Sequence, residues 1–217
     1  MATHGTGSEL TFKTFRFYPK NEEKKNSAVI VLQEWWGINE QIKTHAQYIA
    51  DNTGTLAIVP DLYNGKLGLS AEEASHLMGN LNWEEALMGL EKLVEVLNKE
   101  NRVKIGAIGF CMGGAVSLAI AARLSTKNPL SAAVTCYGIP KPEYADVSKA
   151  AIKTPIQGHF GAEDNFCGPD SVRSLERQLK EAQGYEGKEI SIHIYEGEGH
   201  AFLNEGEWAT QKRKELG

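Results

Sequence analysis

The stretch from Gly109 to Gly114, Gly-Phe-Cys-Met-Gly-Gly, constrains the fold of this chain more than any other. An apolar run before it, Val103 to Ile108, is typical of a buried parallel strand, and a helix rich in small residues is predicted from Gly113 to Leu124. A nucleophile at a sharp strand-to-helix turn, with glycines two positions away on either side, forms a nucleophile elbow. The sequence therefore predicts that Cys111 stands at such a turn, where flanking side chains would crowd the backbone.

The predicted position of Cys111 has chemical consequences. Cys111 would lie at the positive end of the helix that follows, which favours the thiolate form. The backbone N–H of Met112 would point toward an oxyanion that forms beside the sulfur. The alternative interpretation is structural, because a free cysteine beside a glycine-rich helix is commonly buried.

Size and charge exclude several classes of protein. With 217 residues and a net charge of −5, the chain fits one domain over residues 1–217, and its scattered lysines and arginines argue against a nucleic-acid partner. The first fifteen residues lack the apolar stretch of a signal peptide. The longest apolar run, Ala115 to Ala122, is too short to cross a bilayer, so we expect no membrane partner.

Three cysteines are spread along the chain with no Cys-x-x-Cys spacing. This pattern argues against a disulfide scaffold or a zinc ribbon and suits a reducing compartment. We therefore expect a cytoplasmic protein with Cys136 in its core. The sequence leaves open whether the protein is a monomer or a small homo-oligomer, and how Cys167 relates to the site.

Segments predicted to be strands alternate with segments predicted to be helices. The strands are residues 10–18 (an edge strand), 28–32, 56–59, 103–108, 130–137, 155–160 and 190–195. The helices are residues 39–52, a short one capped by Ser70 and Glu73, 82–99, 113–124, 170–182 and a short polar one over 205–216. This order predicts an α/β fold with a mostly parallel sheet covered on both faces, in which ligands bind beyond the carboxyl ends of the strands.

A thiol nucleophile needs a base, and the base needs a group that orients it. His200 follows the last predicted strand in a Gly-His turn, and Asp164 follows the strand that ends at Gly161. The order nucleophile, acid, histidine matches hydrolases that carry such an elbow. Asp164 could instead be a turn cap with Glu163 in the acid role, and His200 could be a loop histidine bonded to backbone. His159 precedes the turn and is interpreted as structural.

A carboxylate and two tryptophans follow another predicted strand, next to the elbow. Glu34, at the end of that strand, would oppose thiolate formation by like-charge repulsion. It could therefore keep the thiol unreactive until substrate arrives. A solvated loop glutamate is the alternative. The backbone N–H of Trp35 is a natural second oxyanion donor, and the Trp35 and Trp36 side chains could line the pocket or fill core.

These motifs together resemble the dienelactone hydrolase (carboxymethylenebutenolidase) family over about residues 10 to 205. The resemblance rests on the segments Gln33-Glu34-Trp35-Trp36-Gly37, Pro60-Asp61-Leu62-Tyr63, Gly109 to Gly114, Asp164 and Gly199-His200-Ala201-Phe202. It implies an α/β-hydrolase fold and a Cys-His-Asp triad: Cys111 as nucleophile, His200 as base and acid, and Asp164 as the orienting carboxylate. It also implies that Glu34 engages the resting thiol and that Tyr63 is a structural or pocket residue.

The resemblance implies hydrolysis of a small ester or lactone through a thioester, without a metal or organic cofactor. Cys111 would attack the carbonyl, the N–H groups of Met112 and Trp35 would hold the oxyanion, and water activated by His200 would release the acid. Losing one oxyanion donor typically costs about 10²–10³ in rate. The position of Trp35 therefore matters for the reaction.

The chain departs from the family where relatives hold a substrate carboxylate with arginines. The position four residues after the histidine is Asn204, and the segment from Lys66 to Asn82 contains no arginine. Asparagine cannot supply the charge or the two-pronged geometry of an arginine, so we predict poor activity on small anionic dienelactones. The chain also lacks an apolar final helix over Glu205 to Gly217.

The sequence does not exclude two other classes of function. The missing arginines and a cysteine at a helix start are compatible with a non-catalytic α/β-hydrolase-like binder or a thiol redox sensor. A peptidase is the weaker alternative, because nothing in the sequence indicates a peptide-binding cleft.

Overall fold

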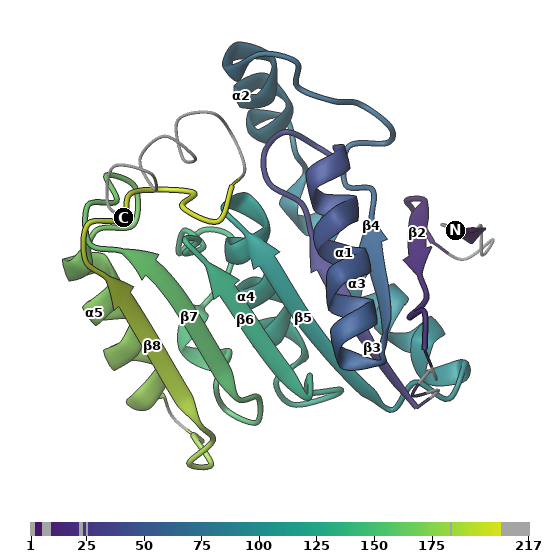
Figure 1. The fold of residues 1–217 in the computed structure, drawn as a ribbon. Helices are drawn as coiled ribbons and strands as arrows, with labels where there is room; N and C mark the ends of the chain where they lie inside the picture. Colours follow the sequence, from purple (N-terminus) through teal and green to yellow (C-terminus); the bar gives the residue numbers. More distant parts are fainter. Residues whose placement is uncertain (1–2, 6–9, 22–23, 25, 183, 205–217) are drawn as a thin grey trace.

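One mixed sheet runs through the molecule in the computed structural model (Figure 1), which describes residues 3–5, 10–21, 24, 26–182 and 184–204. Within the described residues the sheet has eight strands in the order β1-β2-β4-β3-β5-β6-β7-β8. The strands are β1 Thr3–Gly5, β2 Thr14–Phe17, β3 Ser27–Leu32, β4 Leu56–Pro60, β5 Lys104–Phe110, β6 Ala132–Cys136, β7 Ile156–Gly161 and β8 Ile190–Tyr195. Strands β3 to β8 pair in parallel with one another, whereas β1 pairs with β2, and β2 with β4, in the antiparallel sense.

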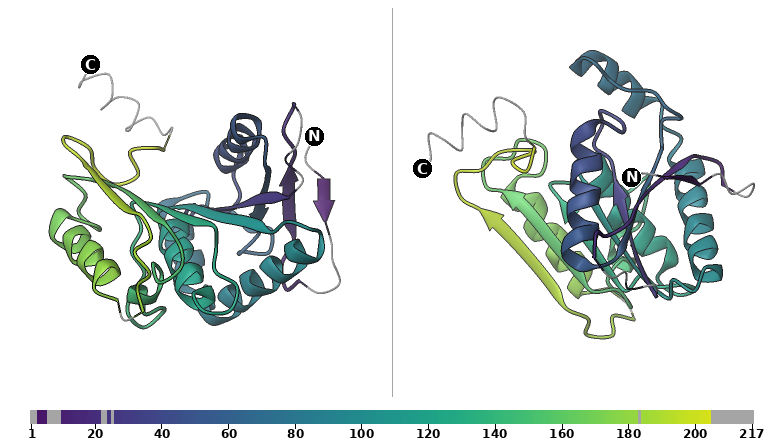
Figure 2. Two further views of the ribbon diagram at one scale, coloured as in Figure 1. Left: turned by 90° about the horizontal axis from the view of Figure 1, so that it is seen from below. Right: turned by 45° about the vertical axis from the view of Figure 1, so that its right-hand side comes forward.

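Helices cover both faces of this sheet. They are α1 Glu40–Thr53, α2 Ala71–Gly79, α3 Trp83–Lys99, α4 Met112–Leu124, the 3-10 turn η1 Val147–Lys149 and α5 Pro169–Lys180. Figure 2 shows α1 on one face and α3, α4 and α5 on the other, and α2 lies beyond the carboxyl ends of the strands at the top of Figure 1. The predicted α/β class, with a mostly parallel sheet covered on both faces, is confirmed.

The prediction of an edge strand over residues 10–18 is wrong in one respect. Residues 14–17 do form a strand, but β1 pairs with its outer side through Thr3↔Arg16, His4↔Phe15 and Gly5↔Thr14. A strand of three residues carries no periodicity that the sequence could reveal. The predicted helix over 205–216 and the final segment from Glu205 to Gly217 lie outside the described residues.

Two apolar layers hold the sheet between its helices. Along β3, Ile30 packs toward α3 and α4, and its neighbour Val31 packs toward α1, because successive side chains on a strand point to opposite faces. Helix α4 is buried along almost its whole length, with Arg123 as its exposed residue. Small residues in α4 allow this close packing against β5 and β6. The elbow is therefore built on the most buried part of the fold.

The helix ends follow the predicted signals. The side chain of Asn39 accepts a hydrogen bond from the N–H of Ile42 at the start of α1, and Gly54 ends that helix with a φ of 66°. The side chain of Ser70 accepts a hydrogen bond from the N–H of Glu73. Among the described residues, no helix is long and apolar enough to cross a membrane.

Candidate active site

The elbow has the backbone strain that its sequence predicts. Cys111 lies between β5 and α4 with φ 52° and ψ −117°, a conformation that costs about 1–3 kcal/mol for a residue other than glycine. A Cβ on Gly109 would lie 1.9 Å from the carbonyl oxygen of Gly113, and a Cβ on Gly113 would lie 2.4 Å from that of Leu32. Both glycines are therefore required sterically, and together they let the turn present the sulfur at the end of the sheet.

Three residues far apart in the sequence meet at this turn. His200 Nε2 lies 3.2 Å from Cys111 Sγ, and His200 Nδ1 lies 2.9 Å from Asp164 Oδ2. The geometry fits a ring that donates its Nδ1 proton to the carboxylate and accepts the thiol proton at Nε2. Each residue follows the carboxyl end of a strand, β5, β7 or β8, so the parallel sheet brings them to one edge.

The carboxylate of Asp164 is held by its own loop as well as by His200. The backbone N–H groups of Phe166 and Cys167 donate to its Oδ1 at 2.7 and 2.9 Å. Burial raises the pKa of Asp164, but these donors and His200 outweigh it, so the net pKa lies below the usual value. Asp164 is thus fixed as a carboxylate beside the imidazole, and the backbone of Cys167 helps to fix it.

Glu34 lies just after the end of β3, and both of its carboxylate oxygens accept hydrogen bonds. Tyr137 Oη donates to Oε1 at 3.2 Å, and Asn204 Nδ2 donates to Oε2 at 2.7 Å. Burial raises the pKa of Glu34, although these two hydrogen bonds and the nearby His200 act in the opposite direction. Glu34 is 7% exposed, which excludes the alternative of a solvated loop residue.

The resting sulfur of Cys111 is held as a thiol. Burial, and next the charge of Glu34, raise the pKa of Cys111 to about 12, while the backbone N–H of Met112 lowers it. The helix terminus therefore lowers the pKa of Cys111, as expected, but burial and Glu34 raise it by more. An attacking sulfur at this site has to pass its proton to a neighbour, and the nearest described base is His200.

The two predicted oxyanion donors differ in what their backbone N–H groups contact, because that of Met112 hydrogen-bonds to the sulfur of Cys111 and lowers its pKa. Met112 is the first residue of α4, where N–H groups have no partner within the helix. Among the described residues nothing accepts a hydrogen bond from the N–H of Trp35, which follows Glu34. Trp35 and Trp36 pack edge to face with ring centroids 5.0 Å apart, and both side chains are half-buried. Both side chains are therefore partly open to solvent and lie outside the fully buried core.

Tyr63 contacts the residue after the nucleophile, whereas Asn204 contacts Glu34. Tyr63 Oη approaches Met112 Sδ at 3.1 Å, and burial raises the pKa of the phenol, so Tyr63 supports the residue after the nucleophile. Asn204 contacts Glu34 and adds no positive charge to the site. These contacts support a structural position for Tyr63 and a place at the site for Asn204.

Sequence reasoning did not find two residues that contact the histidine. The ring of Tyr137 meets the His200 ring edge to face at 5.3 Å, and the ring of Phe166 packs against it at 4.8 Å. Tyr137 follows the carboxyl end of β6, so the rule that selected Asp164 and His200 could have included it. Phe166 lies in a loop, and nothing in the sequence marks it.

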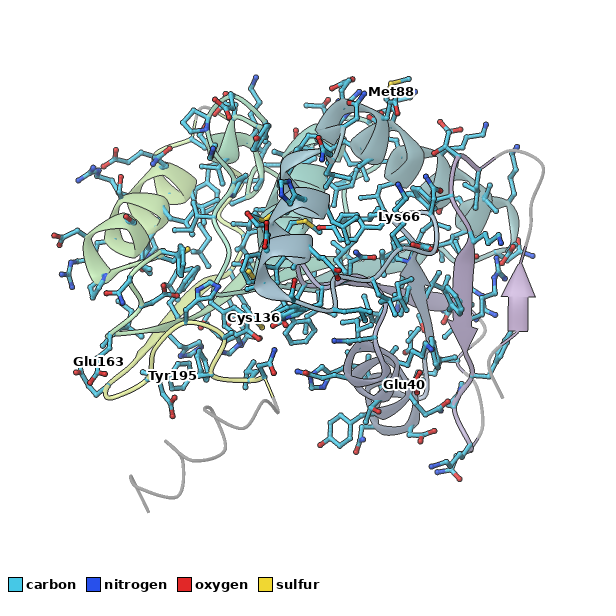
Figure 3. All side chains as sticks on the ribbon, turned by 90° about the horizontal axis from the view of Figure 1, so that it is seen from above. Glu40, Lys66, Met88, Cys136, Glu163 and Tyr195 are labelled. Carbon is cyan, nitrogen blue, oxygen red and sulfur yellow. The ribbon has the colours of Figure 1, made fainter. Side chains whose placement is uncertain are left out.

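The rival candidates lie elsewhere. Glu163 is exposed, and Figure 3 places it at the outer edge of the molecule, whereas its neighbour Asp164 bonds to His200. His159 Nδ1 lies 2.7 Å from Tyr195 Oη and its ring stacks on His193, so it does not join the cluster. Among the residues that the structure describes, no three histidine, cysteine, aspartate or glutamate side chains are grouped to hold a metal ion.

The sequence is similar to that of known proteins over most of its length. Residues 12–216 match the sequence model of the dienelactone hydrolase family. The chain is 30% identical over 186 residues to Protein usf of Aquifex pyrophilus, covering 82% of this chain and 77% of that one. It is 26% identical over 186 residues to the carboxymethylenebutenolidase of Pseudomonas putida, covering 80% of this chain and 74% of that one.

The fold is also similar to solved structures. A dienelactone hydrolase-like promiscuous phosphotriesterase from metagenomic libraries superposes with a TM-score of 0.77 at 17% identity, covering 100% of this chain and 94% of the other. This similarity confirms the expected α/β-hydrolase fold.

Proposed function

Since this chain belongs to the dienelactone hydrolase family and is a hydrolase of carboxylic esters or lactones, we propose that Cys111, His200 and Asp164 are its catalytic triad. The observation that carries the proposal is the position of His200, whose two ring nitrogens reach the sulfur at 3.2 Å and the carboxylate at 2.9 Å. One continuous sheet positions all three side chains, which supports a single catalytic unit over residues 1–217.

The first half of the proposed reaction forms a thioester. Cys111 Sγ attacks the carbonyl carbon of the substrate while its proton passes to His200 Nε2. The N–H groups of Met112 and Trp35 stabilise the oxyanion, and Asp164 stabilises the imidazolium. The bond from carbon to the leaving oxygen then breaks, and His200 returns the proton to the departing alkoxide.

The second half releases the acid. A water molecule gives its proton to His200 and attacks the thioester carbonyl, and the same oxyanion donors stabilise the second tetrahedral intermediate. The bond between carbon and sulfur breaks, and Cys111 regains its proton from the imidazolium. Every proton moves through the chain's own histidine.

The raised pKa of Cys111 favours this enzyme over the redox-sensor alternative. A redox-sensing cysteine depends on thiolate character and exposure, whereas burial and Glu34 raise the pKa of this thiol to about 12. Proton transfer to His200 during attack suits such a thiol.

We also propose that the substrate is a neutral ester or lactone with an apolar group. The buried carboxylate of Glu34 opposes a second negative charge in the site, and Asn204 beside it is neutral. Phe166, which contacts His200, is 80% exposed, and Leu203 after the histidine is 37% exposed. Large exposed apolar side chains beside a reactive group commonly contribute to ligand binding.

Kinetics with purified protein test the triad and the substrate class separately. Cys111→Ala should abolish hydrolysis of phenyl butyrate at an unchanged melting temperature, and rapid quenching of the wild-type reaction should trap a butyryl group on Cys111 by mass spectrometry. Retained activity in Cys111→Ala would overturn the triad. Phenyl butyrate should be hydrolysed at least about tenfold more efficiently than the monophenyl ester of succinic acid, and the reverse order would overturn only the substrate class.

A further inference from the structure

The ring of Phe166 lies beside the histidine of the proposed triad and is open to solvent. Its centroid lies 4.8 Å from that of the His200 ring, at an interplanar angle of 57°, and the residue is 80% exposed. A second aromatic ring at His200, that of Tyr137, belongs to a residue that is only 1% exposed. Phe166 therefore has apolar ring surface available to a ligand at the histidine, whereas Tyr137 is covered.

The backbone of Phe166 is fixed independently of its ring. The N–H of Phe166 donates to Asp164 Oδ1 at 2.7 Å, and the N–H of Cys167 donates to the same oxygen at 2.9 Å. Helix α5 begins shortly after these two residues, at Pro169. Because both contacts come from the backbone, the side chain at residue 166 can be exchanged without removing a donor from Asp164.

The position of His200 determines on which side of the sulfur the alcohol group of an ester leaves. In the proposed reaction, His200 Nε2 accepts the proton of Cys111 Sγ, 3.2 Å away, and then donates it to the departing oxygen. The departing oxygen must therefore come within hydrogen-bond reach of Nε2. The carbonyl oxygen instead faces the N–H groups of Met112 and Trp35. The alcohol group consequently lies next to the histidine, where the ring of Phe166 is exposed.

The order of the strands keeps these two sides apart. Cys111 follows β5, Trp35 lies beyond the end of β3, and Phe166 and His200 lie beyond the ends of β7 and β8. In the sheet, β3 borders β5 on one side, whereas β7 and β8 lie on the other side, beyond β6 (Figure 1). The strands that carry the oxyanion donor Trp35 and the exposed ring of Phe166 therefore lie on opposite sides of the strand that carries the nucleophile.

We propose that Phe166 forms the subsite for the alcohol group of the ester and selects aromatic alcohols. This inference rests on the triad and the reaction proposed above. The ring of the alcohol packs against Phe166 in the offset or edge-to-face arrangement that aromatic pairs prefer. A lactone keeps its leaving oxygen tied to its acyl group, so it brings no separate alcohol ring to this subsite. The subsite therefore favours aryl esters over simple lactones.

Kinetics with paired substrates test which part of the ester contacts Phe166. Phe166→Ala should lower kcat/KM for phenyl butyrate at least about tenfold more than kcat/KM for trifluoroethyl butyrate, whose alcohol has no ring. Each ester is compared with itself in the two proteins, so its intrinsic reactivity cancels. Phenyl acetate and phenyl butyrate, which differ only in the acyl group, should lose the same factor. A loss that grows with the acyl chain would place Phe166 on the acyl side and overturn the proposal.

Two further variants separate binding of the alcohol from support of the histidine. Phe166→Tyr keeps the ring and should keep the wild-type ratio of the two butyrates. Tyr48→Ala removes a ring that is 67% exposed on α1 and should change the kinetics of neither ester. If Phe166→Ala slows phenyl and trifluoroethyl butyrate by the same factor, the ring only supports His200, and the subsite proposal is wrong.

The second half of the reaction tests the subsite from the opposite direction. An added alcohol can attack the butyryl thioester in place of water: its proton passes to His200, the bond between carbon and sulfur breaks, and Cys111 regains the proton. With benzyl alcohol and ethanol at equal concentration, the ratio of benzyl butyrate to ethyl butyrate should fall at least about tenfold in Phe166→Ala. If that ratio is unchanged while Cys111→Ala abolishes hydrolysis, the triad stands and the alcohol subsite is wrong.

Discussion

Asn204 Nδ2 lies 2.7 Å from Glu34 Oε2, and this contact joins the loop after β8 to the end of β3 across the mouth of the proposed active site. Tyr137 Oη occupies the other oxygen of Glu34 at 3.2 Å. The carboxylate is therefore held by two neutral donors, and no described residue forms an ion pair with it. This arrangement leaves the charge of Glu34 uncompensated near the sulfur.

Replacing Asn204 with arginine should change the charge preference of the enzyme. The guanidinium would lie beside Glu34 at the mouth and could hold a substrate carboxylate with two parallel hydrogen bonds. In Asn204→Arg, the ratio of kcat/KM for monophenyl succinate to that for phenyl butyrate should rise by about tenfold or more. Asn204→Gln, which adds length without charge, is the control and should leave the ratio near that of the wild type.

Replacing Glu34 with glutamine should make the sulfur more reactive. The carboxylate raises the pKa of Cys111, so Glu34→Gln should lower that pKa and increase the thiolate fraction at pH 8. Alkylation of Cys111 by iodoacetamide, followed by mass spectrometry, should become roughly three- to fourfold faster for each pKa unit, because the thiolate fraction rises about tenfold while the thiolate becomes a weaker nucleophile. Cys111→Ser identifies the peptide that carries the label, and an unchanged rate in Glu34→Gln would show that burial alone sets the pKa.

Replacing Asp164 with asparagine should show that Asp164, and not its neighbour Glu163, is the carboxylate that orients His200. Asparagine cannot stabilise the imidazolium or hold His200 in the same tautomer, so kcat in Asp164→Asn should fall by about 10³–10⁴. Glu163→Gln is the matched control, because Glu163 is exposed while His200 bonds to Asp164. A comparable loss of activity in Glu163→Gln would contradict the assignment of the acid.

The elbow glycines allow a prediction about stability. A Cβ at residue 109 would lie 1.9 Å from the carbonyl oxygen of Gly113, so Gly109→Ala should lower the free energy of unfolding by at least about 3 kcal/mol. A Cβ on Gly79, at the end of α2, would meet no atom within 4 Å, so Gly79→Ala should be neutral or stabilise by up to about 1 kcal/mol. Urea denaturation measures both, and similar effects of the two changes would contradict the steric argument.

The sequence could predict the elbow, the alternation of strands and helices around it, and the meeting of Cys111 with His200. The reason is that glycine spacing and the carboxyl ends of parallel strands are local signals with fixed geometric consequences. It could not predict that Tyr137 contacts Glu34, because that contact depends on a backbone φ of 43° and on side chains 103 positions apart. The sequence also could not predict that burial outweighs the helix terminus in setting the pKa of Cys111, since desolvation depends on how the folded chain packs.

The buried thiol of Cys136 should make stability depend on alkaline pH. Burial, and next Glu34, raise its pKa to about 12, above the roughly 8.5 expected in the unfolded chain. A raised folded-state pKa stabilises the fold fully below the unfolded value and loses that contribution as the pH rises toward the folded value. The wild type should therefore lose about 2–3 kcal/mol more than Cys136→Ala between pH 8 and pH 10.5, as measured by urea denaturation under reducing conditions. Parallel losses in the two proteins would show that other groups, such as Tyr137, govern the alkaline limit.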